Sequence, residues 1–576
     1  MVRRTQRVFF SPMRITLVQK TLIDAIEKAL EKVSEKIPPR GLPERFKIEL
    51  EVPRDRAHGD FTANTALRLV KYFSVNPVIL AGAIKDELEK PELKNLFADS
   101  IGEIEVLPPG FLNFRLSKPY LYKTLSGILK KKDGFGRVSS GRGVNINMEF
   151  VSANPTGPLT VAHGRQAAVG EALSRILKFY GCDVHKEYFI NDVGTQIDIL
   201  GKSIYGRYLA MNKTLAAFPE DGYHGEYIRG IAGELNKKYG KKFVGAKDAD
   251  LRFIAQFGAE RILKGIKSDL RKFGVSFDKW FSQKNLSRKV VMDALKKLRD
   301  KGCIYEKDGA TWFKSTLFGD DKDRVVVKSD GSFTYLAPDI AYHLNKYRRR
   351  FRRLVNIWGP DHHGYIPRLK ASVEALGYSA DSVSILIVQL ATLYRDGRAL
   401  SMSTRKGEFI TLNEVMNEVG CDVTKFFFLM RKLDSHLDFD LEVAKKNSMD
   451  NPVYYIQYAH ARIASILKFS VKAKDKIENA RLSAELLDKA EEIRILRALC
   501  QFPLVIEKSA VALEPYRIVE YLNELAKMFH SFYTKHRVVL DSDPALTRAR
   551  LTLVKGVKTV LANGLRLLGI SLPERM

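Results

Sequence analysis

The sequence predicts an α/β protein in which a parallel-sheet domain lies between an N-terminal α+β domain and a C-terminal α-helical bundle. Residues 144–150 alternate apolar and polar side chains, as a half-buried strand does. Residues 17–33 place apolar side chains on one side of a helix, ahead of mixed helix and strand patterns. After about residue 412 the apolar stripes recur at helical spacing, which is typical of a bundle.

The central unit indicates the type of sheet. A strand at 144–150, a loop at 152–165, a helix at 169–180 and a strand at 184–190 follow one another. Parallel strands need such a crossover helix between them, so the unit implies a parallel sheet of Rossmann type. Further strand patterns return at residues 354–359 and 384–390.

Breaks in these patterns divide the chain into domains. A polar, glycine-rich stretch at 134–143 precedes the sheet domain, and Asn451-Pro452 is a good helix start for the last domain. We expect an N-terminal domain, a Rossmann-type domain with a helical insertion at about 200–320, a helical junction and a helical bundle. In that order, the four parts cover residues 1–118, 135–412, 413–450 and 451–576.

Composition restricts the class of protein. The 576 residues carry a formal net charge of +28, which favours a polyanionic partner, although basic residues also keep proteins soluble. No run of about 18 uncharged apolar residues occurs, so we expect no membrane span. The cysteines form no C-x-x-C pair, which indicates neither a zinc site nor a disulfide framework and fits a reducing cytoplasm; they are Cys182, Cys303, Cys421 and Cys500.

The first fourteen residues contain four arginines and no acid. They fit either a short organelle-targeting peptide or translation from an upstream start codon. We favour the second interpretation, with the functional chain beginning near Met13, and we expect a cytoplasmic protein.

The loop at 152–165 follows the first strand of the central unit. In open α/β sheets ligands bind there, and the N-terminus of the next helix points at them. Gly157 and Pro158 shape the loop, and His163 lies at the expected helix start, where it can donate a hydrogen bond to a phosphate oxygen. Taken alone, such a loop and histidine are structural more often than functional.

Five segments, in order along nearly the whole chain, resemble one family. EFVSANPTGPLTVAHGRQA (149–167) looks like the HIGH nucleotide signature of class I aminoacyl-tRNA synthetases in its arginyl form, and ALSMSTRKGEFITL (399–412) resembles the second signature, KMSKS. NDVGTQI (191–197) and WGPDHHGYIPRLKA (358–371) resemble further arginyl segments. Residues 435–463 resemble the entry to the arginyl enzymes' anticodon-binding domain. Five ordered matches make chance an insufficient explanation.

The resemblance implies an arginine–tRNA ligase. Such an enzyme activates L-arginine with ATP and Mg²⁺ to arginyl-adenylate, then transfers it to the terminal ribose 2′-hydroxyl of tRNA(Arg). The first step is an in-line attack on the α-phosphate, which needs positioning and charge stabilisation more than acid–base groups. The resemblance also implies a monomer without a structural metal, contact between the N-terminal domain and the tRNA elbow, and activation that requires bound tRNA.

The matching positions assign the nucleotide site. The resemblance places His163 and Thr160, with Arg405 and Lys406 of the second signature, at the reacting phosphates; alone, the last two would suit a solvated turn. It assigns ATP binding to the first loop and to two residues of the second signature, namely Ala153, Asn154, Pro155, Thr156, Gly157, Pro158, Leu159, Thr160, Val161, Ala162, His163, Met402 and Ser403.

The amino-acid pocket must hold a planar guanidinium, for which carboxylates are the natural partners. By the resemblance Asp339 pairs with the guanidinium, Tyr335 packs flat against the substrate, and other residues hold its polar ends. The assigned arginine-binding residues are Glu149, Ser152, Asn154, Tyr335, Asp339 and Gln389. A core position for Tyr335 and a plain strand position for Glu149 are the alternatives.

Three further features have two interpretations each. Asp361, His362 and His363 follow a strand, and because no cysteine or acidic cluster accompanies them we interpret them as nucleotide- or arginine-site residues and not as metal ligands. The basic run at 346–353 is a solvated face or a tRNA-backbone contact. Aromatic and charged residues alternate at the start of the bundle, as if to stack on anticodon bases or to form its core; they are Tyr454, Tyr455, Tyr458, His460 and Arg462.

Some positions depart from the class I signatures. Thr160 and Ala162 replace a histidine and a glycine of HIGH, and Ser401 and Thr404 replace the KMSKS lysines. Some arginyl enzymes that lack that lysine have one in the HIGH loop, where this chain has Gly157. Because a threonine can still donate a hydrogen bond and Lys406 still supplies a cation, we predict an active enzyme.

Three alternative functions compete with this prediction. A cysteinyl or other class I enzyme is one, but a cysteinyl enzyme needs a zinc site with paired cysteines. The signature departures favour a silent, tRNA-binding paralogue, whereas the presence of His163 and Asp339 argues against it. The strand–loop–helix nucleotide site argues against a plain RNA-binding or scaffold protein.

Overall fold

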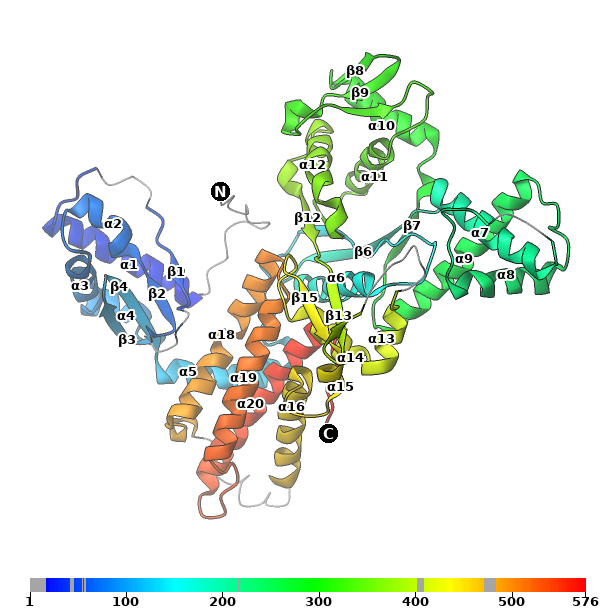
Figure 1. The fold of residues 1–576 in the computed structure, drawn as a ribbon. Coiled ribbons are helices and arrows are strands. Elements are labelled where there is room, and N and C mark those ends of the chain that lie inside the picture. Colours follow the sequence, from blue (N-terminus) through cyan, green and yellow to red (C-terminus); the bar gives the residue numbers. More distant parts are fainter. Residues whose placement is uncertain are drawn as a thin grey trace.

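The computed structural model describes residues 17–41, 46–53, 55, 58–214, 218–400, 409–470 and 483–576. Its fold runs from a small N-terminal domain through a central sheet domain to a bundle of long helices (Figure 1). The predicted fold class is confirmed, because a parallel sheet lies at the centre of a mixed α/β chain.

The N-terminal domain is an antiparallel sheet, of strand order β1-β2-β4-β3, with helices packed beside it. The predicted first helix forms, and its apolar stripe, which includes Leu22, Ile26 and Val33, is buried. The elements are α1 (Leu17–Lys36), β1 (Leu50–Glu51), β2 (Phe61–Ala63), α2 (Thr65–Phe73), α3 (Pro77–Leu88), α4 (Pro91–Phe97), β3 (Ile101–Leu107) and β4 (Phe111–Leu116). α5 (Lys118–Lys131) then crosses to the bundle.

The central sheet has the order β12-β11-β5-β6-β7, and every neighbouring pair is parallel. The predicted strand–loop–helix–strand unit is present, and its helix starts at residue 161, ahead of the apolar pattern at 169–180. Nearly every side chain of that helix is buried, so its first turns show no amphipathic pattern to read. The unit consists of β5 (Asn145–Glu149), α6 (Val161–Phe179) and β6 (Asp183–Ile190), and the other strands are β7 (Lys279–Ser282), β11 (Arg353–Trp358) and β12 (Val383–Ile387).

The insertion after β6 is mostly helical, with β7 and two strands of a second sheet between its helices. Three helices, α7 (Thr195–Met211), α8 (Glu226–Tyr239) and α9 (Asp248–Lys272), extend from the sheet domain (Figure 1). The expected helical insertion continues in α10 (Arg288–Asp300), but the expectation missed the strands of this range. β7 joins the main sheet, and an antiparallel sheet of order β10-β9-β8 follows, built from β8 (Ile304–Lys307), β9 (Ala310–Phe313) and β10 (Arg324–Val327).

A sequence signal for that second sheet was present. Asp308 and Gly309 join β8 to β9 with φ angles of 53° and 73°, as a tight hairpin turn requires. An Asp-Gly pair favours this turn, but the flanking strands are short, mostly half-buried or exposed, and show no clear alternation. The helices around this sheet are α10 (Arg288–Asp300), α11 (Leu336–Arg348) and α12 (Ile366–Ala375).

The junction to the bundle contains a strand besides its helices, which corrects the expectation of a purely helical 413–450. β15 (Leu437–Asp440) pairs in parallel with β13 (Ala391–Arg395), which forms a hairpin with β14 (Arg398–Ala399). The helices of the junction are α13 (Leu412–Val419), α14 (Cys421–Leu429) and α15 (Leu441–Lys445).

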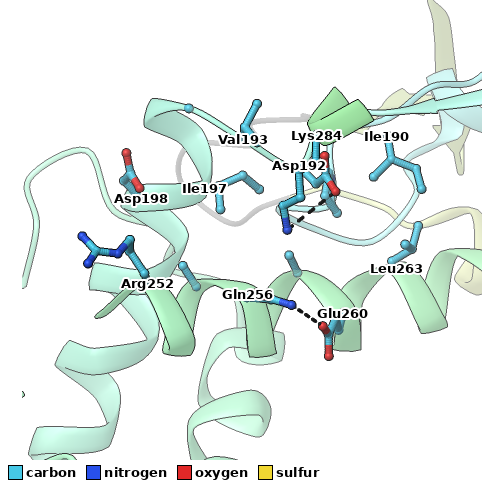
Figure 2. A pocket seen from close by; sticks show the side chains of 14 residues that line it. Ile190, Asp192, Val193, Ile197, Asp198, Arg252, Gln256, Glu260, Leu263 and Lys284 are labelled. Carbon is cyan, nitrogen blue, oxygen red and sulfur yellow. Dashed lines mark hydrogen bonds and ion pairs between the residues drawn. The ribbon is translucent and has the colours of Figure 1, made fainter. Parts of the chain in front are cut away.

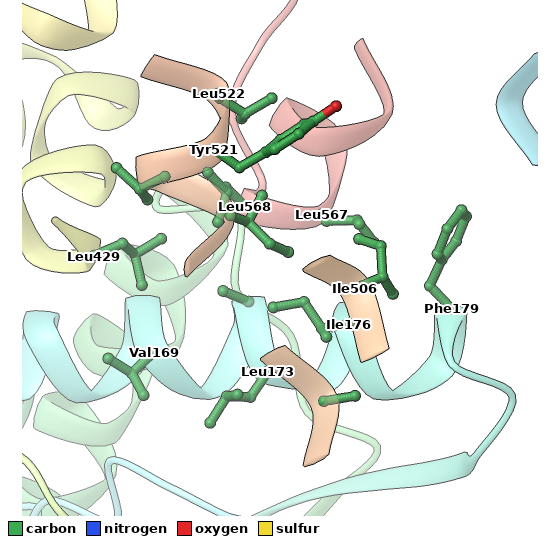
Figure 3. Close-up of a cluster of buried hydrophobic side chains, with 14 of the residues drawn as sticks. Val169, Leu173, Ile176, Phe179, Leu429, Ile506, Tyr521, Leu522, Leu567 and Leu568 are labelled. Atoms are coloured by element: carbon green, nitrogen blue, oxygen red, sulfur yellow. The ribbon is translucent and has the colours of Figure 1, made fainter. Parts of the chain in front are cut away.

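The C-terminal bundle packs directly on the helix of the central unit. Figure 3 shows Val169, Leu173 and Ile176 of α6 facing leucines of α14, α19 and α20 and Ile506 of α18. α6 is thereby held between the sheet and the bundle. The bundle consists of α16 (Pro452–Ser470), which starts as predicted at Asn451-Pro452, α18 (Ala490–Ala512), α19 (Tyr516–Lys535) and α20 (Pro544–Leu568).

Among the described residues, no single helix has the length and apolarity that a membrane crossing requires. α2 and α3 reach both only as a pair, which is bent by 111°. Leu69 of α2 and Leu80 and Ile84 of α3 are fully buried in the N-terminal domain.

Candidate active site

The chain bends sharply where β5 ends. Val151 and Ser152 have φ angles of 67° and 40°, a left-handed conformation that is strained in residues with a Cβ, above all in a β-branched one. The Ser152 hydroxyl donates to Glu149 Oε1 at 3.1 Å and accepts from the Phe189 N–H at 3.1 Å. These bonds hold the bend, so that the following loop leaves at the carboxyl edge of the sheet, where ligands bind.

Tyrosines from outside the loop fix its main chain. The Tyr188 hydroxyl on β6 donates to the Ala153 carbonyl, and the Tyr227 hydroxyl on α8 donates to the Thr156 carbonyl, both at 2.8 Å. Burial raises the pKa of both hydroxyls, so both remain protonated donors. The predicted nucleotide loop is thereby preorganised, because its shape does not depend on a ligand.

His163 lies in the first turn of α6, at the helix start where it was expected. Its Nδ1 accepts the Thr160 backbone N–H at 3.1 Å and lies 3.0 Å from the Thr160 hydroxyl. Burial lowers the pKa of His163 to about 4, so the ring is neutral at pH 7. Because Nδ1 accepts, the ring proton is on Nε2, which leaves an uncharged N–H donor.

Two of the acids predicted to bind arginine lie within electrostatic range of each other, Asp339 on α11 and Glu149 on β5. Glu149 Oε2 pairs at 2.5 Å with the buried Lys346 ammonium, which also donates to Asn356 Oδ1 at 3.1 Å. Asp339 Oδ2 accepts from the Tyr365 hydroxyl at 2.6 Å. Burial raises the pKa of Asp339 to about 7, although that hydrogen bond lowers it. One carboxylate is therefore paired with a cation, while the other, as far as the described residues go, is bonded only to a hydroxyl donor.

The remaining predicted arginine-binding residues lie around this pair or apart from it. Tyr335, at the start of α11, is 82% exposed, which rules out the alternative of a core position. The Asn154 side chain donates to Gln196 Oε1 at 2.6 Å. Gln389 lies beyond the end of β12, which stops at Ile387 and not at residue 390 as predicted. Ser152 is hydrogen-bonded to Glu149, and Glu149 is within electrostatic range of Asp339. Gln389 lies in the segment that connects β12 to β13.

Asp339 shares one face of α11 with His343 and Lys346, which hold the two acids in place. Neither His343 nor Lys346 was predicted as a residue of the arginine site. Asp339, His343 and Lys346 follow the i, i+4, i+7 spacing of a single helix face, a signal that was available in the sequence. Burial lowers the pKa of His343 to about 3, so its ring is neutral. His343 Nδ1 lies 2.8 Å from the Asp339 carbonyl, and Nε2 lies 2.9 Å from the Asn356 amide. The network therefore runs from one acid's main chain to the other acid's counter-ion.

The basic run at 346–353 is not simply a surface feature. Besides the buried Lys346, Arg349 points inward and donates to both carboxylate oxygens of the buried Glu187, at 2.6 and 2.8 Å. The Tyr342 hydroxyl donates to the same carboxylate at 2.7 Å. The expectation of a solvated or RNA-contacting face is therefore wrong for two of the cations, and it stays a prediction for the exposed Arg348, Arg350 and Arg352.

Asp361, His362 and His363 lie exposed in a short 3₁₀ turn, Pro360–Tyr365, after β11. The His362 ring packs against Trp358, with ring centroids 5.7 Å apart. In the described ranges, no group of three or more His, Cys, Asp or Glu side chains is arranged to hold a metal ion.

The second nucleotide signature can be placed only by its ends. Its predicted site residues, Met402, Ser403, Arg405 and Lys406, lie outside the described residues. On its C-terminal side, Thr411 forms a β-bridge with Thr160, and the Leu412 N–H donates to the Leu159 carbonyl at 2.8 Å. The described end of the second signature is therefore bonded directly to the first.

A cavity of about 360 Å³ opens beside the nucleotide loop, between α7, α9 and the segment that follows β6. Residues of the NDVGTQI segment line it together with Pro155 (Figure 2). The Lys284 ammonium lies 3.8 Å from Asp192 Oδ2, and Ser282 donates to the same oxygen at 2.6 Å. Both charge signs and an apolar wall, which includes Ile197, meet in this cavity.

Only part of the predicted RNA-contacting set lies on the surface of the bundle. The Tyr454 and Tyr458 rings stack at 6.1 Å between centroids, and Tyr458 stacks on His530 at 5.9 Å. Arg462 is exposed and lies over a tyrosine ring. His460, in contrast, is 2% exposed, and its Nδ1 lies 3.0 Å from the Pro573 carbonyl. Its burial rules out direct contact with an RNA in this structure, so we withdraw it from the predicted set.

Comparison with known families accounts for nearly the whole chain. Residues 20–116 match the arginyl tRNA synthetase N-terminal domain, and residues 124–426 match the catalytic domain of class I (R) tRNA synthetases. Residues 456–576 match the DALR anticodon binding domain.

Known proteins resemble the chain over most of its length. Curated arginine–tRNA ligases from Desulfosudis oleivorans and Listeria welshimeri are 46% and 44% identical, and the matches cover 92% and 98% of this chain and 95% and 100% of those proteins. The arginyl-tRNA synthetase structure from Thermus thermophilus has a TM-score of 0.74 at 22% identity, and covers 97% of this chain and 100% of that one. At that identity the structural likeness supports the fold alone.

Proposed function

The chain belongs to the class I arginyl-tRNA synthetase family, and on that premise we propose how its residues perform the reaction. It is an arginine–tRNA ligase, which forms arginyl-adenylate from L-arginine and ATP and then esterifies tRNA. The observation that carries its amino-acid specificity is the unequal pair of acids. Glu149 is already paired with Lys346, and Asp339 is half-buried with a hydroxyl as its bonded partner.

The substrate guanidinium binds at Asp339. A guanidinium stays charged at every working pH, and it donates charge-assisted hydrogen bonds to the half-buried carboxylate. The exposed Tyr335 ring covers the guanidinium or its aliphatic stem. Glu149 and Ser152, held by Lys346 and by the Phe189 N–H, hold the substrate's α-amino end. Asn154 and Gln389 are assigned to the same site by family position.

Activation uses the loop from Ala153 to His163. The arginine carboxylate attacks the α-phosphorus of ATP, which enters with Mg²⁺; a phosphorus–oxygen bond forms as the bond to pyrophosphate breaks. The neutral His163 donates from Nε2 to a phosphate oxygen, and Thr160 adds a hydroxyl donor. Arg405 and Lys406 are assigned to the leaving pyrophosphate, where their charge offsets that of the product.

Transfer requires the end of the tRNA beside the adenylate. The cavity next to Pro155 is of a size for one nucleotide, and it combines Arg252 and Lys284 for a phosphate with Asp192 and Asp198 for ribose hydroxyls. The terminal 2′-hydroxyl attacks the arginyl carbonyl carbon, and AMP leaves. The proposed second substrate is tRNA(Arg).

The other domains are assigned to the rest of the tRNA. We place anticodon bases on the half-buried stack of Tyr454 and Tyr458, with Arg462 at the backbone. The N-terminal domain contacts the tRNA elbow. A cytoplasmic monomer with the four-part domain division given above remains part of the proposal.

ATP–pyrophosphate exchange tests the proposed function. The purified full chain is assayed with arginine and with each other amino acid, in the presence and absence of total tRNA. Exchange with arginine alone, and only when tRNA is present, is the expected result. Tight tRNA binding without exchange for any amino acid would contradict it and would point to a silent, tRNA-binding paralogue.

A further inference from the structure

Arg165 lies two residues after His163 in α6, and its side chain is completely buried. Its guanidinium donates to four main-chain carbonyls. Nη1 reaches those of Gln389 at 2.7 Å, Ser435 at 3.0 Å and Leu390 at 3.3 Å, and Nη2 reaches that of Lys432 at 3.0 Å.

Burying this cation is costly. The four hydrogen bonds of its guanidinium all end on neutral carbonyls, which replace only part of the lost hydration. Burial lowers the pKa of Arg165 to about 10, an effect that the nearby Asp434 opposes. A cation near the N-terminus of a helix is also disfavoured by the helix dipole. Because a well-packed apolar side chain is often as stable in such a place, stability alone does not account for the guanidinium.

The four carbonyls belong to two segments that are far apart in the sequence. Residues 389 and 390 lead directly into β13, and residues 432–435 lead into β15. These two strands pair in the small sheet whose β13–β14 hairpin ends at Ala399, where the second signature begins in the sequence. One side chain of α6 therefore holds the start of both strands against the helix that carries His163.

We propose that Arg165 is a positioning residue for adenylate formation, which fixes the β13–β15 sheet relative to His163. The inference rests on the proposed function. Only a planar fork of donors satisfies four carbonyls from two segments at once; a lysine ammonium is a single point of charge. The hydrogen bonds of Arg165 reach neither Glu149 nor Asp339, and they reach Gln389 only at its main-chain carbonyl, so loss of Arg165 disturbs the reacting phosphates more than arginine binding.

Arg165→Lys and Arg165→Gln test this proposal, with Arg175→Lys as the matched control. Arg175 is also on α6, but it is only half-buried; it pairs with Glu171 at 2.8 Å and donates to the Arg566 carbonyl at 3.1 Å. Active sites are titrated first, so that kcat refers to folded enzyme. Because a shift of about 1 Å can cost about 100-fold, we expect kcat of exchange to fall about 100-fold in both variants, with KM for arginine within about twofold of the parent. The control keeps both constants.

Guanidinium rescue of Arg165→Ala provides a second measurement. Added guanidinium ion at non-denaturing concentration is expected to raise kcat about tenfold, whereas tetramethylammonium, which has no N–H donor, does not. A titrated kcat equal to the parent's in Arg165→Lys and Arg165→Gln, or an equal rise in KM for arginine, would overturn the proposal. Failure of the proposed function would differ, because the parent enzyme itself would then show no exchange with arginine.

Discussion

The arginine end and the phosphate end of the proposed site differ in the charge of the side chains that form them. At the arginine end, Glu149, Lys346 and Asp339 are ionisable groups within one buried network. At the described phosphate end, the donors are uncharged, a neutral His163 and the Thr160 hydroxyl. A substrate that is always positively charged needs an unmatched carboxylate, and that carboxylate needs its neighbour to be neutralised. Phosphates, which bring their own charge and metal, need donors in fixed places more than charges.

The largest expected effect comes from removing the internal counter-ion. Lys346→Met leaves the buried Glu149 carboxylate unpaired, so the free energy of unfolding falls by about 3 to 5 kcal/mol. Denaturant unfolding measures the change. Arg348→Met, at an exposed position of the same helix, is the control and is expected to stay within about 0.5 kcal/mol. Equal stabilities for the two variants would show that the acids are not buttressed as described.

Removing the neutral donor should affect turnover. His163→Ala is expected to lower kcat of pyrophosphate exchange about 100-fold or more, the usual loss for one preorganised donor, without a matching change in KM for arginine. His163→Gln, whose amide N–H lies near the position of Nε2, is expected to recover part of this loss. An effect confined to KM for arginine would contradict the separation of the two ends.

The complementary change affects binding. Asp339→Asn keeps the side-chain shape but removes the charge, which costs about 2 to 3 kcal/mol for a charge-assisted hydrogen bond, or about 30- to 150-fold in KM for arginine. Steady-state exchange at saturating ATP measures it, with kcat expected to change much less. A kcat loss as large as that of His163→Ala would mean that both ends share one function.

The smallest expected effect concerns the bundle, far from both ends. Tyr458→Ala removes one ring from the half-buried stack and is expected to raise KM for tRNA about fivefold, since stacking on a base contributes about 1 kcal/mol or more. Phe469→Ala, an exposed ring at the far end of the same helix, is the control in the aminoacylation assay. Equal KM values for the two variants would remove Tyr458 from the proposed RNA contact.

The sequence was sufficient to predict site residues that belong to local motifs. It was insufficient to predict residues whose roles depend on packing between distant segments. The loop, the helix carrying His163 and the two acids could be found from motif and resemblance. The role of Lys346 could not, because a lysine within a basic run is usually solvated and only the i, i+4, i+7 spacing from Asp339 marked its inward face. Arg165 was equally hidden, since its partners are main-chain carbonyls more than two hundred residues away, and these leave no pattern of side chains.

The pH dependence of kcat/KM for arginine tests the difference between the arginine end and the phosphate end most directly. Asp339, with a pKa raised to about 7 by burial, is protonated and neutral below that pH and a carboxylate above it. In exchange assays from about pH 5.5 to about pH 8.5, kcat/KM should therefore rise about tenfold per pH unit up to about pH 7 and then level off. His163, with a pKa near 4, should add no inflection in this range. The account predicts that Asp339→Asn abolishes the inflection and His163→Gln retains it; an inflection that persists in Asp339→Asn would contradict it.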